Sequence, residues 1–343
     1  MARRNGLLLI NLGTPDSTDV EDVRQFLSEF LGDPLVLGGF SLSRKALVNL
    51  LICPLRGPRS AAAYEKVWTE AGSPIAVHGR ELRDKVAAAL PNTVVTLAMR
   101  YRVPSIAAAL AELRAQGADS LVVLPLFPQF SSSTTESIIQ DLSARHQRMG
   151  RPFALKFIRD FYEHPAFIEA AAAVARPILD RFQPDLLLMS YHGVPEDYLR
   201  KDDPSGSRCL WSAECCDSID EVNRSCYRAQ CFATSRALAK ALALDEESWC
   251  ATFQSQFGPK TWTGPATAKV IEDLPSRGIK KLAVICPAFA ADCLETLEEV
   301  GMGLKIAFIE NGGESFELIP CVNAHEAWVD GVVQLFQESL GAG

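Results

Sequence analysis

The chain has 343 residues, of which 48% are hydrophobic and 22% charged, and this composition excludes a disordered or fibrous protein. At about 150 residues per domain, the length predicts two domains. The net charge is −8 and no segment concentrates Lys and Arg, which argues against a nucleic-acid-binding protein. The longest stretch without a charge, 120–135, is shorter than the roughly 20 apolar residues of a membrane-spanning helix.

The amino end predicts a first strand rather than a secretory signal. Its apolar run, 7–10, stops at Asn11, and no small-residue cleavage site follows. We therefore expect a cytoplasmic protein, in which clustered cysteines are more often metal ligands than disulfides.

Eight short apolar runs are expected as strands, and helical segments such as 105–116 and 166–182 separate them. The runs are continuous in hydrophobicity, as in parallel sheets covered on both faces. Alternation of strand and helix also predicts parallel sheets. The expected strands are 6–12, 94–99, 121–124, 154–158, 186–189, 250–253, 282–286 and 316–319.

The two halves of the chain repeat the same turns. Gly13-Thr14-Pro15-Asp16 follows the first strand, and Gly193-Val194-Pro195-Glu196 follows the fifth. We infer two similar four-stranded α/β domains, with chance similarity of turns as the alternative. The expected domains are 1–157 and 158–323, and the last helix, 324–343, can pack back on the first domain.

Unusual segments follow the carboxyl ends of several strands, where open parallel sheets bind ligands. This agreement in position predicts one shared cleft between the domains. The segments are 100–101, 128–135, 191–196, 254–265 and 289–299.

One of the five histidines has a position that indicates chemistry. His192 lies between a buried-looking strand and the tight turn at Gly193, where it can be a general base, a metal ligand or a structural cap. The others are expected at the surface: His78, His146, His164 and His325.

Two acids lie four residues apart on a predicted helix. Glu295 and Glu299 share one helix face, and such a pair of like charges can hold a cation. Asp292 followed by Glu295 is also the pattern of a capping box, which is the purely structural explanation.

Three further segments fit either ligand binding or packing. The loop 256–265, with its tryptophan, and the segment 127–135 offer aromatic faces to a flat ligand or pack on the core. The Ser/Thr run 131–135 also fits a helix cap or an anion site. The apolar stretch 35–55 is either a buried helix or an apolar lip at a cleft or membrane surface.

Six segments, in order along nearly the whole chain, together resemble ferrochelatase, the enzyme that inserts ferrous iron into a porphyrin. They are 8–15, 99–101, 125–135, 190–196, 253–265 and 287–299. The resemblance implies a lyase that forms protoheme from protoporphyrin IX in the last step of heme biosynthesis. It also implies two Rossmann-like domains, each with a mostly parallel four-stranded sheet flanked by helices, and a substrate cleft between them.

The resemblance also implies roles for individual residues. His192 matches the active-site histidine, Glu295 faces it across the porphyrin, and Glu299 continues an acidic path. His192 and Glu295 are thereby the residues expected to meet the ferrous iron. The apolar stretch 35–55 matches the region through which porphyrin enters, with peripheral membrane contact as a further expectation. The residues expected to hold the porphyrin are Arg100, Tyr101, Ser132, Trp262 and Phe289.

The sequence departs from the common bacterial pattern by an insertion, 205–226, which contains Cys209, Cys215, Cys216 and Cys226. Four thiolates suit an iron–sulfur cluster or zinc. Resemblance to cluster-bearing members implies a two-iron two-sulfur cluster, with zinc as the alternative. Cys231 is an alternative ligand.

Other functions remain as alternatives. These are a coproporphyrin ferrochelatase, a small chelatase that inserts another metal such as cobalt, and a non-catalytic tetrapyrrole carrier. A carrier has no need of both His192 and Glu295. A nucleotide-binding protein of this architecture would show G-x-G-x-x-G after the first strand, and here Thr14 and Pro15 follow Gly13.

Overall fold

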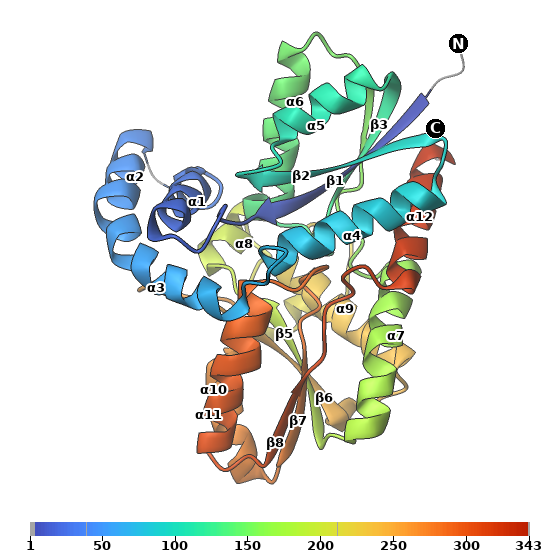
Figure 1. Ribbon diagram of the computed structural model, residues 1–343. Helices are drawn as coiled ribbons and strands as arrows, with labels where there is room; N and C mark the ends of the chain where they lie inside the picture. Colours follow the sequence, from blue (N-terminus) through green and yellow to red (C-terminus); the bar gives the residue numbers. More distant parts are fainter. Residues whose placement is uncertain (1–3, 39, 211, 342–343) are drawn as a thin grey trace. The chain divides into compact units, whose positions relative to one another are not determined.

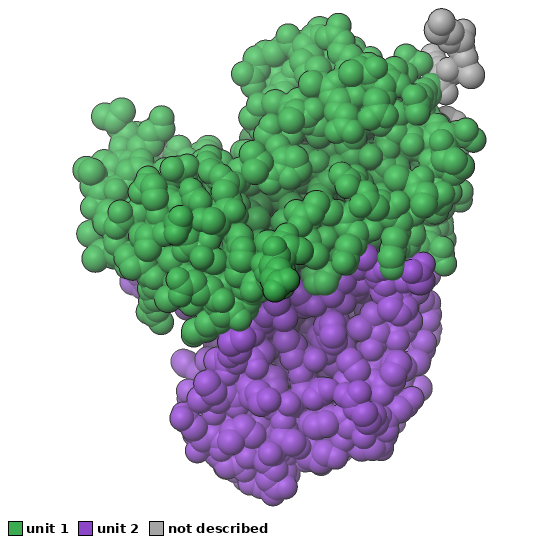
Figure 2. All heavy atoms as spheres, viewed as in Figure 1, with its two compact units in different colours: residues 1–127, 132–160, 329–343 green, residues 128–131, 161–328 purple. Residues whose placement is uncertain are grey.

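The structure, a computed structural model, describes residues 4–38, 40–210 and 212–341. The chain forms two compact units, shown in different colours in Figure 2. Unit 1 comprises 1–127, 132–160 and 329–343, and unit 2 comprises 128–131 and 161–328. The chain thus passes into unit 2 at 128–131, returns to unit 1, and leaves it again after residue 160. The end of the last helix is fastened within unit 1, where Lys156 Nζ donates to the Ser339 carbonyl at 2.8 Å.

Unit 1 contains a parallel four-stranded sheet in the order β2-β1-β3-β4 (Figure 1). Its strands are β1 (Arg4–Gly13), β2 (Thr93–Tyr101), β3 (Ala118–Pro125) and β4 (Ala154–Phe157). Its helices are α1 (Val20–Gly32), α2 (Ser41–Leu47), α3 (Cys53–Val67), α4 (Pro74–Ala89), α5 (Ile106–Ala115) and α6 (Ser137–Arg148), with short π-helices η1 (Val48–Ile52) and η2 (Ser132–Glu136).

Unit 2 repeats this arrangement with the parallel order β6-β5-β7-β8. Its strands are β5 (Leu186–His192), β6 (Trp249–Gln254), β7 (Lys281–Ile285) and β8 (Ser315–Leu318). Its helices are α7 (Pro165–Phe182), α8 (Glu196–Asp202), α9 (Tyr227–Ala241), α10 (Thr267–Asp273), the π-helix η6 (Glu295–Leu304), α11 (Lys305–Glu310) and the start of α12 (Glu326–Gly341), with short 3₁₀ turns η3 (Ala213–Cys216), η4 (Glu246–Ser248) and η5 (Leu274–Arg277).

The eight expected strands and the two similar α/β sheets are confirmed. In each unit, the strand that comes first along the sequence lies between the second and the third strands of that unit, and the fourth strand lies at the edge beside the third. Side chains of the strands pack with those of the covering helices into a hydrophobic cluster in each unit. In unit 1, Leu8 and Ile10 of β1 pack with Leu110 of α5 and Leu142 of α6. In unit 2, Leu188 of β5 belongs to the corresponding cluster.

The apolar stretch 35–55 does not form a buried helix. Four of its large side chains are 71–87% exposed: Phe40, Leu42, Leu50 and Leu55. The buried-helix alternative is therefore wrong, because α2, η1 and the start of α3 present these side chains outward. Among the residues that the structure describes, no helix combines the length and the apolar character needed to cross a bilayer.

One histidine expected at the surface is buried. His146 is only 8% exposed, and its Nε2 lies 3.0 Å from the carbonyl of Phe153 and 3.2 Å from the backbone nitrogen of the same residue. The His146 side chain thereby joins the last turn of α6 to the backbone just before β4, so His146 has a structural role.

Candidate active site

His192 is the last residue of β5, an interior strand of the unit 2 sheet. Open parallel sheets bind ligands at these carboxyl ends of their strands. Its Nδ1 lies 2.7 Å from the carbonyl oxygen of Gly193. Because a carbonyl only accepts hydrogen bonds, Nδ1 carries the proton of the neutral ring. Nε2 is therefore the basic nitrogen, and it is the atom able to take a proton from a ligand.

The turn after His192 requires a glycine. A Cβ atom at Gly193 would lie 2.8 Å from the carbonyl oxygen of Gln254, which accepts a hydrogen bond from the Gly193 nitrogen at 2.8 Å. The next residue is fixed by Thr263, since Val194 and Thr263 exchange hydrogen bonds of 3.0 and 2.9 Å. The loop that carries Trp262 is thereby attached directly to the His192 turn.

The acidic helix begins differently from the sequence expectation. The carboxylate of Asp292 accepts hydrogen bonds from Thr296 Oγ1 at 3.1 Å and from Asn323 Nδ2 at 2.7 Å. The backbone nitrogen of Cys293 donates a hydrogen bond to Thr296 Oγ1 at 3.1 Å, just before the helix begins. The alternative of a capping box formed by Asp292 and Glu295 is therefore wrong. Helix η6 instead starts at Glu295 with π-helical winding. Such winding is rare in proteins, and where it occurs it is often at a functional site.

Two residues at the end of β6 hold both candidate acids. Gln254 Nε2 donates to the backbone carbonyl of Glu295 at 3.1 Å. The backbone nitrogen of Ser255 donates to Glu299 Oε1 at 2.8 Å, and the Ser255 hydroxyl donates to Glu299 Oε2 at 2.6 Å. Gln254 is itself fixed by the hydroxyl of Ser190, which donates to its Oε1 at 2.7 Å. Sequence reasoning missed these two residues, although it did single out the segment 254–265 that contains them.

The pKa of Glu299 depends on the charges of both His192 and Glu295, so the three groups belong to one electrostatic site. Burial raises the pKa of Glu299 above its ordinary value. The Ser255 hydrogen bonds and the charge of His192 lower it, while the negative charge of Glu295 raises it, and the net direction is upward. Glu299 therefore exchanges protons closer to neutral pH than an exposed glutamate does.

Removing the Ser255 hydroxyl should shift this titration. We expect Ser255→Ala to raise the pKa of Glu299 further, because the lost hydrogen bond stabilises the charged carboxylate. The carboxyl should then stay protonated to higher pH. Isotope-edited infrared titration of the carboxyl band, with Glu299→Gln to assign it, measures the shift. An unchanged or lowered pKa would contradict this electrostatic account.

Two aromatic side chains expected to contact a ligand lie in unit 2. The ring of Phe289 lies 6.4 Å from the imidazole of His192 between centroids. Trp262 donates its Nε1–H to the carbonyl of Phe257 at 2.9 Å, and the two rings are 4.9 Å apart. Phe289 is thus placed beside His192, and Trp262 lies in the loop attached to the His192 turn.

The candidate porphyrin residues of unit 1 form a network around Asp33. Its Oδ2 accepts hydrogen bonds from Arg100 Nη2 at 2.7 Å, from the Tyr101 hydroxyl at 3.0 Å and from the Ser137 hydroxyl at 2.6 Å. Tyr101 is 3% exposed, and burial raises the pKa of its hydroxyl. Arg100 keeps further N–H donors for a ligand, whereas Tyr101 is enclosed. Ser132 is half-buried at the start of η2.

This network predicts a stability effect. We expect Asp33→Ala to lower the free energy of unfolding by about 3 kcal/mol, because it leaves Arg100, Tyr101 and Ser137 without their shared acceptor. Asp33→Asn keeps one acceptor oxygen and should lose less. Urea unfolding of the three proteins measures the order, and equal stabilities would contradict it.

A family model described as ferrochelatase matches residues 4–340 of the chain. The chain belongs to the ferrochelatase family. Ferrochelatases are lyases that insert iron into a porphyrin. The ferrochelatase of Legionella pneumophila is 43% identical over 339 residues, which cover 98% of this chain and 100% of the relative. The ferrochelatase of Pseudomonas putida is 43% identical over 327 residues, which cover 95% and 96%.

Solved structures resemble this ferrochelatase in fold. The sirohydrochlorin chelatase SirB from Bacillus subtilis subspecies spizizenii, in complex with cobalt, superposes with a TM-score of 0.53 at 10% identity, over 98% of this chain and 95% of that one. SirB from Bacillus subtilis with Fe³⁺ gives 0.52 at 11% identity, over the same shares. At such low identity the likeness concerns the fold alone.

The four thiols of the cysteine-rich insertion follow one another in a chain of contacts. The Sγ atoms of Cys215 and Cys216 are 3.6 Å apart, and interactions with Cys209 and burial raise the pKa of Cys226 to about 11. The hydrogen bond from Cys226 lowers the pKa of Cys209. Cys231, the alternative ligand, is fully buried, and burial raises its pKa. Thiols are the donor type that an iron–sulfur cluster or zinc takes.

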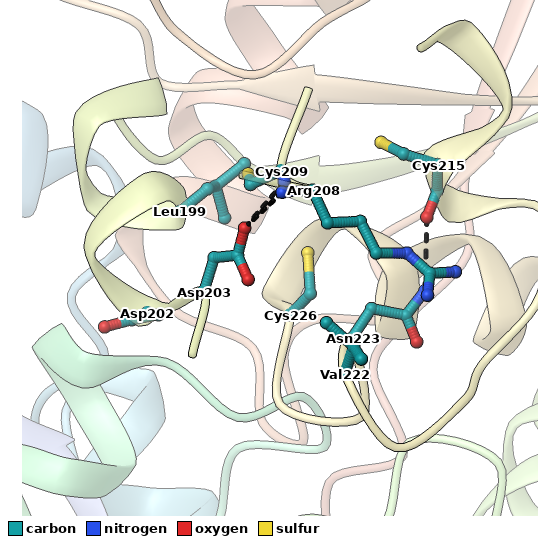
Figure 3. Close-up of a pocket in the computed structure, with 9 residues that line it drawn as sticks. All are labelled: Leu199, Asp202, Asp203, Arg208, Cys209, Cys215, Val222, Asn223 and Cys226. Atoms are coloured by element: carbon teal, nitrogen blue, oxygen red, sulfur yellow. Dashed lines mark hydrogen bonds between the residues drawn. The ribbon is translucent and has the colours of Figure 1, made fainter. Parts of the chain in front are cut away.

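Figure 3 shows Cys209, Cys215 and Cys226 around a small pocket. Asp203 anchors its rim, because its carboxylate accepts hydrogen bonds from the backbone nitrogens of Arg208 and Cys209, both at 2.8 Å. With the added bond from Ser205, these contacts lower the pKa of Asp203 to about 2. Within residues 4–38, 40–210 and 212–341, however, no group of three or more His, Cys, Asp or Glu side chains is arranged to hold a metal ion.

Proposed function

We propose that this ferrochelatase forms protoheme from ferrous iron and protoporphyrin IX, with His192 as the base that takes protons from the porphyrin. The observation that carries the proposal is the hydrogen bond of His192 Nδ1 to Gly193, which leaves Nε2 as the proton acceptor. Insertion requires that the porphyrin lose its pyrrole protons and that iron take their place. No change in oxidation state is needed.

Glu295 and Glu299 have complementary roles in the proposal. Glu295 supplies negative charge near the entering ferrous ion. Glu299, whose pKa is raised by burial, receives protons from His192 and passes them on toward solvent. The hydrogen bonds from Gln254 and Ser255 support these roles, since they fix the backbone of one acid and the carboxylate of the other.

Further residues are assigned to the porphyrin itself. We assign the porphyrin rim and its carboxylates to Arg100 and Ser132, and ring contacts to Phe289 and Trp262. Tyr101 orients Arg100 through their shared partner Asp33, because its own hydroxyl is enclosed.

The substrate is tested by a direct comparison of two porphyrins. Protoporphyrin IX and coproporphyrin are offered separately with ferrous iron, and kcat/KM is measured for each. We expect protoporphyrin to be the preferred substrate. A preference for coproporphyrin would replace this substrate assignment, and porphyrin binding with no metal insertion would favour the carrier function.

The insertion is assigned a two-iron two-sulfur cluster, held by Cys209, Cys215, Cys216 and Cys226. The support is the chain of thiol contacts and the N–H donor that Arg228 Nη1 directs at Cys216 Sγ, at 3.1 Å. A bound cluster would supply a redox-active iron centre. Ultraviolet–visible and electron paramagnetic resonance spectra of anaerobically purified protein test the assignment. Colourless protein with about one bound zinc would contradict it.

The exposed apolar side chains of 35–55 are assigned to peripheral membrane contact and porphyrin entrance. Phe40 and Leu42 are more than 80% exposed, which favours insertion into an apolar surface. We expect Phe40→Glu with Leu42→Glu to abolish flotation with phospholipid vesicles. Ile306→Glu, which changes an exposed apolar residue of unit 2, serves as the matched control. Equal flotation of all proteins would contradict the assignment.

A further inference from the structure

The cysteine-rich insertion ends where helix α9 begins, and the first residue of this helix reaches His192. Cys226 is the capping residue of α9. The next residue, Tyr227, is 7% exposed and donates its hydroxyl proton to the backbone carbonyl of His192 at 2.8 Å. The residue next to Cys226, the last cysteine of the insertion, is therefore hydrogen bonded to the candidate base.

The peptide group between His192 and Gly193 is held from both sides. Tyr227 donates to its oxygen, and its N–H donates to the carbonyl of Gln254 at 2.8 Å. The imidazole in turn bonds to the carbonyl of Gly193, one peptide further along. Because the ring is oriented by this backbone, the Tyr227 hydrogen bond contributes to the direction in which Nε2 points.

Arg228 forms a second connection from the same turn of α9. Its Nη1 donates to Cys216 Sγ at 3.1 Å, and its Nη2 donates to the carbonyl of Gly264 at 3.3 Å. Gly264 follows Thr263, which exchanges hydrogen bonds with Val194. A displacement of Cys216 thus reaches the strand end of His192 along a second path.

We propose that Tyr227 and Arg228 are positioning residues, through which the state of the cysteine-rich insertion sets the orientation of His192. The inference rests on the proposed role of His192 as base. Anything that draws Cys216 and Cys226 into a new arrangement acts on the two residues at the start of α9. By linkage, the coupling runs in both directions, so the arrangement at His192 also biases the thiols.

A double-mutant cycle tests the coupling in the full-length chain, reduced and metal-free. Cys216→Ser is the disturbance, and it is placed in the wild-type background and in Tyr227→Phe with Arg228→Met. The readout is the imidazole proton resonance of His192 at fixed pH, assigned with His192→Ala among only five histidines. We expect the disturbance to move this resonance in the wild-type background only.

Tyr191→Phe is the matched control. Tyr191 is also buried and also connects β5 to α9, but its hydroxyl pairs with Ser235 Oγ at 2.7 Å and not with the His192 carbonyl. In the Tyr191→Phe background, Cys216→Ser should still move the His192 resonance. The Tyr191→Phe background shows whether the loss of any buried hydroxyl between β5 and α9 is enough to break the coupling between Cys216 and His192.

Kinetics give a second readout. We expect Tyr227→Phe to lower kcat about fivefold, the factor that corresponds to one ordinary hydrogen bond, with KM for porphyrin unchanged. A change in KM alone would make Tyr227 a structural residue.

Two resonance results would overturn the proposal. One is a His192 signal that Cys216→Ser leaves in place in the wild-type background, and the other is a signal that it moves equally in both backgrounds. If the wild-type chain lacked insertion activity, the proposed function would fail, while the resonance experiment would still decide the coupling.

Discussion

Replacing His192 by alanine should lower kcat for iron insertion about a thousandfold, within the range that a positioned general base contributes. The variant should still bind porphyrin, because the aromatic and polar residues assigned to the macrocycle are unchanged. Its fold should also be retained, since His192 is half-buried and its ring hydrogen bonds to the adjacent Gly193. Anaerobic turnover with ferrous iron and fluorescence titration with porphyrin measure the two properties separately.

His78→Ala is the control for this variant. His78 is a partly exposed histidine of α4, with Glu81 at 3.3 Å as its partner, and its loss should leave turnover unchanged. A His192→Ala protein that retains more than about a tenth of wild-type turnover would remove His192 from the proton-transfer step.

Glu295→Gln should lower kcat about a hundredfold, because it removes the negative charge assigned to the iron while keeping the side-chain shape. It should also lower the pKa of Glu299, since the charge of Glu295 raises that pKa. The acidic limb of the pH–rate profile should therefore move to lower pH. Ser255→Ala should move the same limb in the opposite direction, so the two variants test the sign of the electrostatic account.

Glu310→Gln provides a matched charge change at the exposed end of the same continuous helix. We expect its kcat and pH profile to equal those of the wild type. Equal losses in Glu295→Gln and Glu310→Gln would mean that the net charge of the helix matters and not the placement of Glu295.

The sheets were predictable because their strands are buried on both faces. The runs at β1 and β5 are continuous in apolar residues, and the central position of both strands explains this pattern. His192 was predictable for the same reason, since a polar residue that ends such a strand lies at the ligand-binding edge. Glu295 was singled out by its helical spacing with Glu299, and its role opposite His192 came from the family resemblance.

The contacts that hold these groups could not be read from the sequence. Gln254 and Ser255 reach Glu295 and Glu299 across more than forty positions of chain, and Asp33 gathers partners from β2 and α6. Such pairings depend on which strand ends lie side by side. The contacts of Asp292 with Thr296 and with the distant Asn323 were likewise not visible in the sequence, nor was the π-helical winding of η6.

Two features were ambiguous for a different reason. Apolar residues at 35–55 fit a buried helix and an exposed lip equally well, because periodicity alone does not say whether a partner covers a helix face. His146 lies among polar neighbours in the sequence, yet the turn after α6 folds the backbone of Phe153 over its ring.

The central claim is tested most directly by mixing the purified chain anaerobically with ferrous iron and protoporphyrin IX. Porphyrin fluorescence and heme absorbance are recorded together. The account predicts that fluorescence falls while heme absorbance rises, at a rate proportional to the protein concentration. Porphyrin fluorescence that shifts on binding, with no metalloporphyrin formed from ferrous, zinc or cobalt ions, would contradict it.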